Sequence, residues 1–426
     1  MRSKSGQTLK IALTANLFEW YEFSLTAFMA LEIGRLFFPD TNEKTALISS
    51  FSVFASSYLA RLIGSILFGI LGARYGTGAS LKISMIGMAV PASLIAVLPT
   101  YQTAGHFSTF LLLALKITQG FCAGGEMPLS GYFVSLNADR TNRGLYCALT
   151  VASGFIGMLL ASAAVFLLPH IRYALDHLAS PENYAYLNEP WRWPFFLCMP
   201  LSISIYLLRS AINKSEVKVD SGKLRAKPTF PLLQSLAVVA FAEIVIYIIF
   251  VWMPNYLHVY LGKQSFDARL SNISSLIIFS ISMACAGYAE RYFCARNIAL
   301  FGTIATAISV YPSFIIMQYG GIFALLFSQA ILAISAGCVV GVIFVVLPDL
   351  FKKNWGSLGM VVTYSFATAI FGGTAPVFCA YLIELTHFIA APAIYIFLMG
   401  MLAAAAIYKI YPPSKTKFRY RAPNSV

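Results

Sequence analysis

Six ionisable side chains lie inside long apolar stretches of the chain, where charge is costly. Four are acidic and two are basic: Glu19, Glu22, Glu126, Glu243, Arg61 and Lys116. Burial disfavours the charged form of a carboxyl group, whereas a nearby cation favours it. A carboxyl group balanced between these effects can take up and release a proton as its site faces each side of a membrane.

The first apolar stretch places its acidic residues on neighbouring faces of a helix. At 100° per residue, one arc carries Asn16, Glu19, Phe23 and Thr26, and Glu22 lies about 60° away. We therefore expect Glu19 to face a cavity and to carry a coupled proton. For Glu22, proton coupling and a structural hydrogen bond both remain open.

Residues 115–144 combine an ionisable stripe with a glycine stripe. Along the first stripe lie Lys116, Gln119, Ala123, Glu126, Met127 and Ser130, and along the second lie Gly120, Gly124 and Gly131. This pattern indicates a helix that lines a pathway, or else a core helix with paired charges. Lys116 lies about 15 Å along the axis from Glu126, so its counter-ion is either a Glu of the first helix or a substrate carboxylate.

The remaining candidates could contact a substrate directly. Arg61 either pairs with a Glu of another helix or presents its fork to a carboxylate. Glu243 is either a substrate contact or a structural partner. Aromatic residues near these positions could form a wall for a quaternary ammonium, or could simply pack: Trp20, Tyr21, Tyr247 and Trp252.

Composition identifies the elements that carry these residues. Of the 426 residues, 58% are hydrophobic and 11% are charged, which is typical of an all-α polytopic membrane protein. Twelve spans are predicted, at 11–38, 47–72, 80–98, 108–135, 144–168, 191–209, 229–257, 270–288, 297–317, 322–347, 357–383 and 391–411. The net charge of +13 is spread over short loops, so no nucleic-acid partner is expected. The seven cysteines lack metal-ligand spacing, and no cofactor or metal is expected.

The loop charges predict the orientation. Alternate loops carry 22 Lys and Arg on one side and 5 on the other, which places both termini in the cytoplasm. A long polar loop at 209–228 separates two six-helix halves, 1–208 and 229–411, and a basic tail follows at 412–426. A faint repeat supports this division, because Gly72-Ala-Arg-Tyr75 and Ala289-Glu-Arg-Tyr292 follow the second span of each half.

Several motifs resemble one known family. Residues 16–23 read NLFEWYEF, 61–64 read RLIG, 119–126 read QGFCAGGE, 191–195 read WRWPF and 370–376 read IFGGTAP. Together they are similar to the metabolite:proton symporters of the major facilitator superfamily, which carry proline/betaine, α-ketoglutarate, citrate or shikimate. The resemblance implies proton symport of a small zwitterion or carboxylate by alternating access, in a bacterial inner membrane. We expect a functional monomer whose partners are the substrate, protons and the lipid bilayer.

The resemblance also implies further site residues. Tyr364 precedes the helix 11 motif and joins the substrate candidates, and the cytoplasmic gating loops would use Gly72, Arg74, Gly76, Arg143, Glu290 and Arg291. The loop motif is degenerate, because Ala73 and Thr77 replace an Asp and an Arg. Lys116 replaces a second Arg. The usual Glu near the end of helix 4 falls at Leu136, and the basic positions before helix 11 are Asn354 and Gly356. Gating energetics are therefore expected to differ from those of better-known members.

A second class of function remains open. A transporter-like sensor or an uncoupled facilitator could use the same fold. No Walker or HExxH motif is present, so an enzyme is not expected and an ion gradient is the predicted energy source. The intramembrane carboxyl groups favour coupled transport, because a sensor needs no titratable route.

Overall fold

The structure is a computed structural model that describes residues 2–39, 42–75, 77–124, 141–178, 189–201, 229–351 and 356–410. It also describes single residues within 131–138 and residue 203. Within these ranges the secondary structure is entirely helical. The predicted central loop, the basic tail and Glu126 lie outside the described residues.

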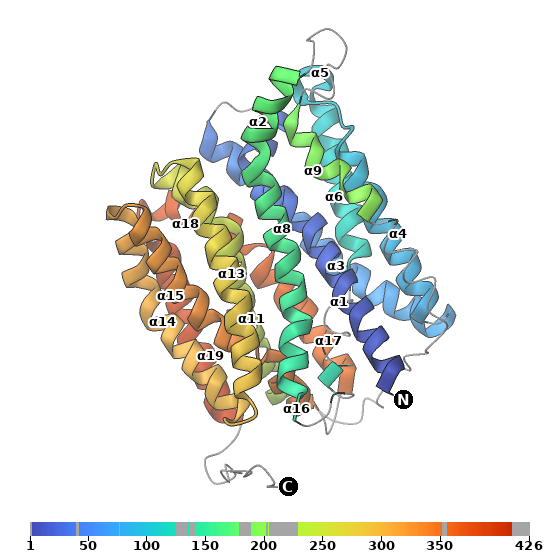
Figure 1. The fold of residues 1–426 in the computed structure, drawn as a ribbon, viewed down its shortest axis with the longest axis vertical. Coiled ribbons are helices and arrows are strands. Elements are labelled where there is room, and N and C mark those ends of the chain that lie inside the picture. Colours follow the sequence, from blue (N-terminus) through green and yellow to red (C-terminus); the bar gives the residue numbers. More distant parts are fainter. Residues whose placement is uncertain are drawn as a thin grey trace.

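The first half is built from long helices with short connections. Its elements are α1 (Arg2–Phe28), α2 (Ala30–Phe37), α3 (Glu43–Tyr75), α4 (Thr77–Ile95), α5 (Tyr101–Ala104), α6 (His106–Cys122), α8 (Arg143–Leu178), η1 (Pro190–Arg192) and α9 (Trp193–Phe196). The first predicted span is interrupted at Met29, where α1 gives way to α2. α1 lies against α8, and α3 lies against α6 (Figure 1).

The second half contains several π-helical turns. Its elements are α11 (Thr229–Ile246), η2 (Tyr247–Trp252), α12 (Met253–Asn255), η3 (Tyr256–Tyr260), α13 (Ser265–Ala289), α14 (Ala295–Tyr319), α15 (Ile322–Val340), α16 (Ile343–Phe351), α17 (Gly356–Ala367), η4 (Thr368–Gly372), α18 (Ala375–Thr386) and α19 (Ala391–Ile410). The π-helical turns η2, η3 and η4 occur in the two spans that carry Glu243 and Tyr364. Such turns are rare and concentrate at functional sites.

Eight helices in the described part are long and apolar enough to cross a membrane. All twelve predicted spans coincide with helix over at least part of their length, but the count of twelve remains a prediction. The described part of α1 begins, and α19 ends, at the same end of the bundle (Figure 1). This arrangement agrees with an even number of crossings.

The two halves of the sequence meet along two seams. α8 lies against α13 on one seam, and α3 lies against η4 and α18 on the other. Small residues bring the first seam together, because Gly144 and Gly287 each face the other's backbone.

Arg192 is one of the five basic residues counted on the side opposite the termini, at the predicted start of the sixth span. Its side chain is buried and donates to the carbonyl oxygens of Ala96 and Leu98, both at 2.8 Å. It also forms an ion pair with Glu189 at 2.9 Å. Arg192 therefore ties the segment 189–196 to the end of α4.

Candidate functional site

A buried ion pair joins α1 to α3 at the centre of the first half. The guanidinium of Arg61 contacts the Glu19 carboxylate, and both side chains are at least 90% buried. Arg61 Nε also donates to the carbonyl oxygen of Ala123 at 3.0 Å. The guanidinium lies over the rings of Phe23 and Tyr58, at 5.7 and 5.9 Å from their centroids. Glu19 of the first helix is thus the acidic partner of Arg61 among the described residues, and the substrate-carboxylate role of Arg61 remains a prediction.

A pair of tyrosines connects this ion pair to the second half. Tyr58 lies one turn before Arg61 on α3, and its hydroxyl group is hydrogen-bonded to that of Tyr247 on η2. The two rings are nearly perpendicular, with centroids 5.2 Å apart. The ring centroid of Trp20 lies 6.5 Å from that of Tyr247. The aromatic residues Trp20 and Tyr247 thus do come together, with Tyr58 and Phe54 beside them.

Glu243 completes the cluster from α11. Its side chain is 1% exposed, and the hydroxyl groups of Tyr364 and Thr368 face its carboxyl group. Among the residues the structure describes, neither carboxyl oxygen has a donor at full hydrogen-bond geometry. Arg61 is close enough to interact with it electrostatically. Arg61 therefore pairs with Glu19 and lies within electrostatic range of Glu243, a second buried carboxyl group that comes from the other half of the chain.

The charge of this cluster has a direct chemical consequence. With both carboxyl groups ionised, Glu19, Glu243 and Arg61 sum to one negative charge. A net charge in a low-dielectric interior is costly unless it is compensated. The cluster can reach neutrality by taking up one positive charge, which can be a proton or the cationic group of a ligand.

Lys116 belongs to a second, adjacent cluster. It is fully buried, and its Nζ donates to Gln119 Oε1 at 2.6 Å. The ammonium lies 4.9 Å from the centroid of the Phe23 ring, and the Arg61 guanidinium lies over the same ring. Glu22 is the acidic group that interacts with it electrostatically. Glu19 therefore pairs with Arg61, and Glu22 lies within electrostatic range of the neighbouring cation Lys116.

Two substrate candidates on α1 contact neighbouring helices. Asn16 donates to the carbonyl oxygen of Thr150 at 2.8 Å, which holds α1 against α8. Tyr21 donates to the carbonyl oxygen of Pro194 at 3.2 Å, which holds α1 against α9. Both contacts hold α1 against neighbouring helices, and the substrate-binding roles of Asn16 and Tyr21 remain predictions. The Trp252 ring is tilted against the rings of Tyr256 and Tyr260, with centroids 4.7 and 6.0 Å away.

The gating candidates among the described residues bridge the two halves near the termini. Arg143 Nε donates to the carbonyl oxygen of Ser135 at 3.0 Å. Arg143 Nη2 donates to the carbonyl oxygen of Val345, in the second half, at 3.5 Å. Arg291 is hydrogen-bonded to Asn142. The Glu290 side chain lies beside Gly144. Gly76 and the side chain of Arg74 lie outside the described residues, as does the environment of Gly72.

Two residues of the cluster, Tyr58 and Thr368, were not predicted from the sequence. Tyr58 lies three residues before Arg61, and residues at this spacing share a helix face. That spacing could have identified it. Nothing in the sequence singles out Thr368, because its position beside Glu243 depends on how α11 packs against η4.

A bundle of membrane-length helices with ionisable groups buried between its halves defines a membrane transporter. A family model described as Major Facilitator Superfamily matches residues 23–294, and the chain belongs to this family. It is therefore a membrane transporter and not an enzyme, as predicted.

Individual relatives agree with this assignment. The chain is 27% identical to the "Ectoine/proline transporter ProP" of Corynebacterium glutamicum, over 95% of this chain and 83% of that one. It is 25% identical to the "Citrate-proton symporter" of Klebsiella pneumoniae, over 96% and 92% of the two chains. A solved "D-xylose-proton symporter" superposes with a TM-score of 0.72 at 18% identity. The match covers 96% of this chain and 99% of the symporter chain. The first two names confirm the resemblance to the metabolite:proton symporter branch, and the third shows the fold.

Proposed function

We propose that this chain is a proton-coupled symporter of a small zwitterion or monocarboxylate that works by alternating access. The observation that carries the proposal is the buried Glu19–Arg61 ion pair, which lies within electrostatic range of a second buried carboxyl group, Glu243, from the other half. Such a cluster accommodates one additional positive charge at a time. Two relatives are named as an ectoine/proline transporter and a citrate-proton symporter, and these names support the same class of transport.

The residues of the cluster suggest a division of roles. A proton on Glu19 would neutralise that carboxylate and leave the Arg61 fork available for a substrate carboxylate. Glu243 would then face the cationic end of a zwitterion, with Tyr58 and Tyr247 beside it as aromatic neighbours. Glu22 and Lys116, which lie next to this cluster, would set its electrostatic background. Glu126 remains a further proton-coupling candidate.

Contacts between the halves support alternating access. Near the termini, Arg143 and Arg291 connect α8 to residues of the second half. At the opposite end, Lys44 pairs with Glu384 at 3.4 Å. A central site can open to one side at a time if only one of these sets of contacts is released.

The test of this function is uptake into proteoliposomes with an imposed pH gradient. We expect radiolabelled proline or glycine betaine to accumulate when the outside is acidic. Glu19→Gln should abolish accumulation while changing substrate affinity by no more than about tenfold, which corresponds to roughly 1.4 kcal/mol. Glu43→Gln, a change at an exposed acidic residue, is the control and should accumulate normally.

Two results would redirect the proposal. Uptake that ignores the pH gradient would identify an uncoupled facilitator, and absence of uptake together with ligand binding would favour a sensor. Accumulation that survives Glu19→Gln but fails in Glu126→Gln would move the proton site to the fourth predicted span.

We also propose a bacterial inner-membrane location, two six-helix halves, a functional monomer and cytoplasmic termini. The orientation can be tested with cysteines. Cys294 is an exposed native cysteine near the end of the bundle that holds the termini, and Gln264 is exposed between η3 and α13. In variants that retain one cysteine each, an impermeant maleimide should label Gln264→Cys in intact cells and should not label Cys294. The reverse pattern would invert the orientation.

A further inference from the structure

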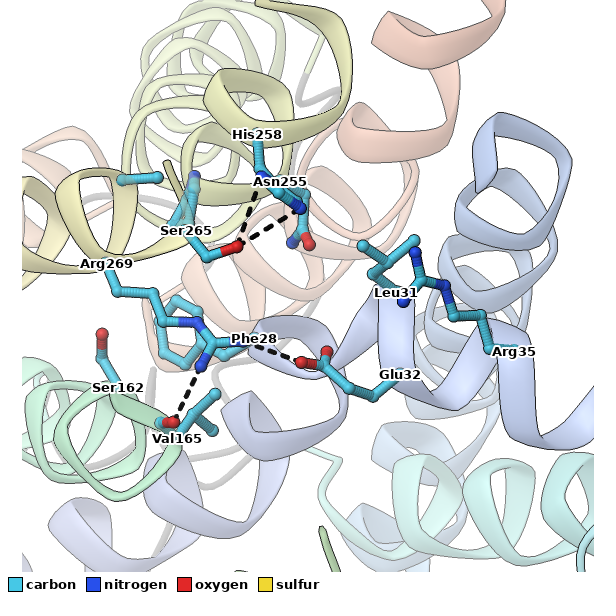
Figure 2. A pocket seen from close by; sticks show the side chains of 12 residues that line it. Phe28, Leu31, Glu32, Arg35, Ser162, Val165, Asn255, His258, Ser265 and Arg269 are labelled. Carbon is cyan, nitrogen blue, oxygen red and sulfur yellow. Dashed lines mark hydrogen bonds and ion pairs between the residues drawn. The ribbon is translucent and has the colours of Figure 1, made fainter. Parts of the chain in front are cut away.

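A cavity lies between the two halves, at the end of the bundle opposite the termini. Its volume is about 110 Å³, whereas one water molecule needs roughly 10–15 Å³ on the same measure. The lining side chains come from α1, α2 and α8 of the first half, and from α12, η3 and α13 of the second (Figure 2). The cavity is thus large enough for a small metabolite, and it is separate from the Glu19–Arg61–Glu243 cluster.

An ion pair that joins the halves forms one wall of this cavity. Arg269 on α13 contacts Glu32 on α2 at 2.7 Å and donates to the carbonyl oxygen of Val165 at 3.1 Å. Figure 2 shows both contacts meeting at the Arg269 guanidinium. The side chains of Arg269 and Glu32 are 21% and 34% exposed. Ion pairs that retain this much exposure contribute little net stability, so the pair can be exchanged at low cost.

The other polar groups that line the cavity have ion-pair or hydrogen-bond partners of their own. Arg35 also lines the cavity, and it pairs with Glu43 at the surface. The His258 ring lies 2.9 Å from the carbonyl oxygen of Lys263 and 3.3 Å from Ser265 Oγ. Asn255 donates to the carbonyl oxygen of Ala27 at 3.3 Å, which is a second contact between the halves beside the ion pair.

We propose that this cavity is a vestibule site that binds a small zwitterion between Arg269 and Glu32. The ligand carboxylate would take the place of Glu32 on the Arg269 fork, and the ligand ammonium would take the place of Arg269 on Glu32. A zwitterion is the ligand class that can insert in this way without leaving either protein charge unpaired. A plain carboxylate would leave Glu32 without a cation, and a plain amine would leave Arg269 without an anion.

Insertion of the ligand has a consequence for the contact between the halves. It replaces a direct α2–α13 ion pair by one that runs through a mobile molecule. The ligand therefore loosens the closure at this end as it binds, before it reaches the central cluster. The inference rests on the proposed transport function, and it narrows the substrate class from zwitterion or monocarboxylate to zwitterion.

The experiment measures ligand protection of a cysteine in the full-length protein. Ser265→Cys in a background without other cysteines places a thiol in the cavity lining, where maleimide labelling can be timed. Millimolar glycine betaine should slow labelling severalfold, and acetate should not. Arg269→Gln should abolish the protection. His106→Gln, a change at an exposed residue outside the cavity lining, should leave the protection intact.

The readout does not depend on transport, so the two proposals can fail separately. Protection by glycine betaine without gradient-driven uptake would contradict the transport function and retain the vestibule site. Protection that persists in Arg269→Gln but disappears in Arg61→Lys would place the ligand in the central cluster and overturn the vestibule site. Equal protection by acetate and glycine betaine would overturn its zwitterion preference.

Discussion

Arg61→Ala is expected to destabilise the protein by about 3–5 kcal/mol, because it leaves the Glu19 carboxylate buried without the cation that compensates it. The guanidinium is 91% buried with its partner on α1, and its Nε–H also satisfies the carbonyl oxygen of Ala123. Both interactions are lost in the variant. Thermal unfolding of purified protein in detergent should show a clearly lower midpoint, and gradient-driven uptake should be lost.

Three companion variants separate charge from packing at this position. Arg61→Lys keeps the charge but replaces the planar fork by a point donor, so an intermediate loss of stability is expected. Glu19→Gln combined with Arg61→Ala removes the uncompensated charge and should recover part of the lost stability. Arg35→Ala removes an exposed pair and should cost at most about 1 kcal/mol. A double variant no more stable than Arg61→Ala would contradict the buried-charge explanation.

Gly64→Val is expected to lower the unfolding midpoint by several degrees, with a loss of about 3 kcal/mol or more. A side chain at Gly64 would overlap the backbone carbonyl group of Phe121 on α6. Backbone cannot move aside as a flexible side chain can, so α3 and α6 must separate. Separation would also draw the Ala123 carbonyl oxygen away from Arg61, which lies one turn earlier on α3.

The matched control for this prediction is Gly321→Ala. Gly321 precedes α15, has a negative φ of −84°, and has no neighbouring atom within 4 Å of the position that a Cβ would occupy. Its substitution should leave the unfolding midpoint within a degree or two. Gly120→Val, which would overlap the backbone of Ser57, should behave like Gly64→Val. Unchanged stability of Gly64→Val would show that α3 and α6 can separate at little cost.

The sequence alone determined the class of protein and the set of costly residues. Uninterrupted apolar stretches of membrane length can fold only as helices in a bilayer, because each backbone group must be satisfied within its own segment. A charged residue inside such a stretch stands out for the same reason. Glu19, Arg61, Lys116 and Glu243 were therefore identifiable from the order of residues alone, and each is buried.

Tertiary structure decided which of these residues interact. Helix periodicity assigns a side chain to a face, but it does not specify the neighbouring helix that the face meets. Arg61 had several possible partners in sequence, and only the packing of α1 against α3 selects Glu19. In the same way, Asn16 and Tyr21 donate hydrogen bonds to backbone carbonyl groups of α8 and α9.

The contacts between the halves were the least accessible to sequence reasoning. Glu243 lies beside Tyr364 and Thr368 at the junction of α11 with α17 and η4, and Glu32 pairs with Arg269 across 237 residues of chain. The π-helical turns η2 and η4 adjust the register of the two spans at that junction. Long-range contacts of this kind depend on how preformed helices dock, which is set by the summed packing of many side chains and not by any local pattern.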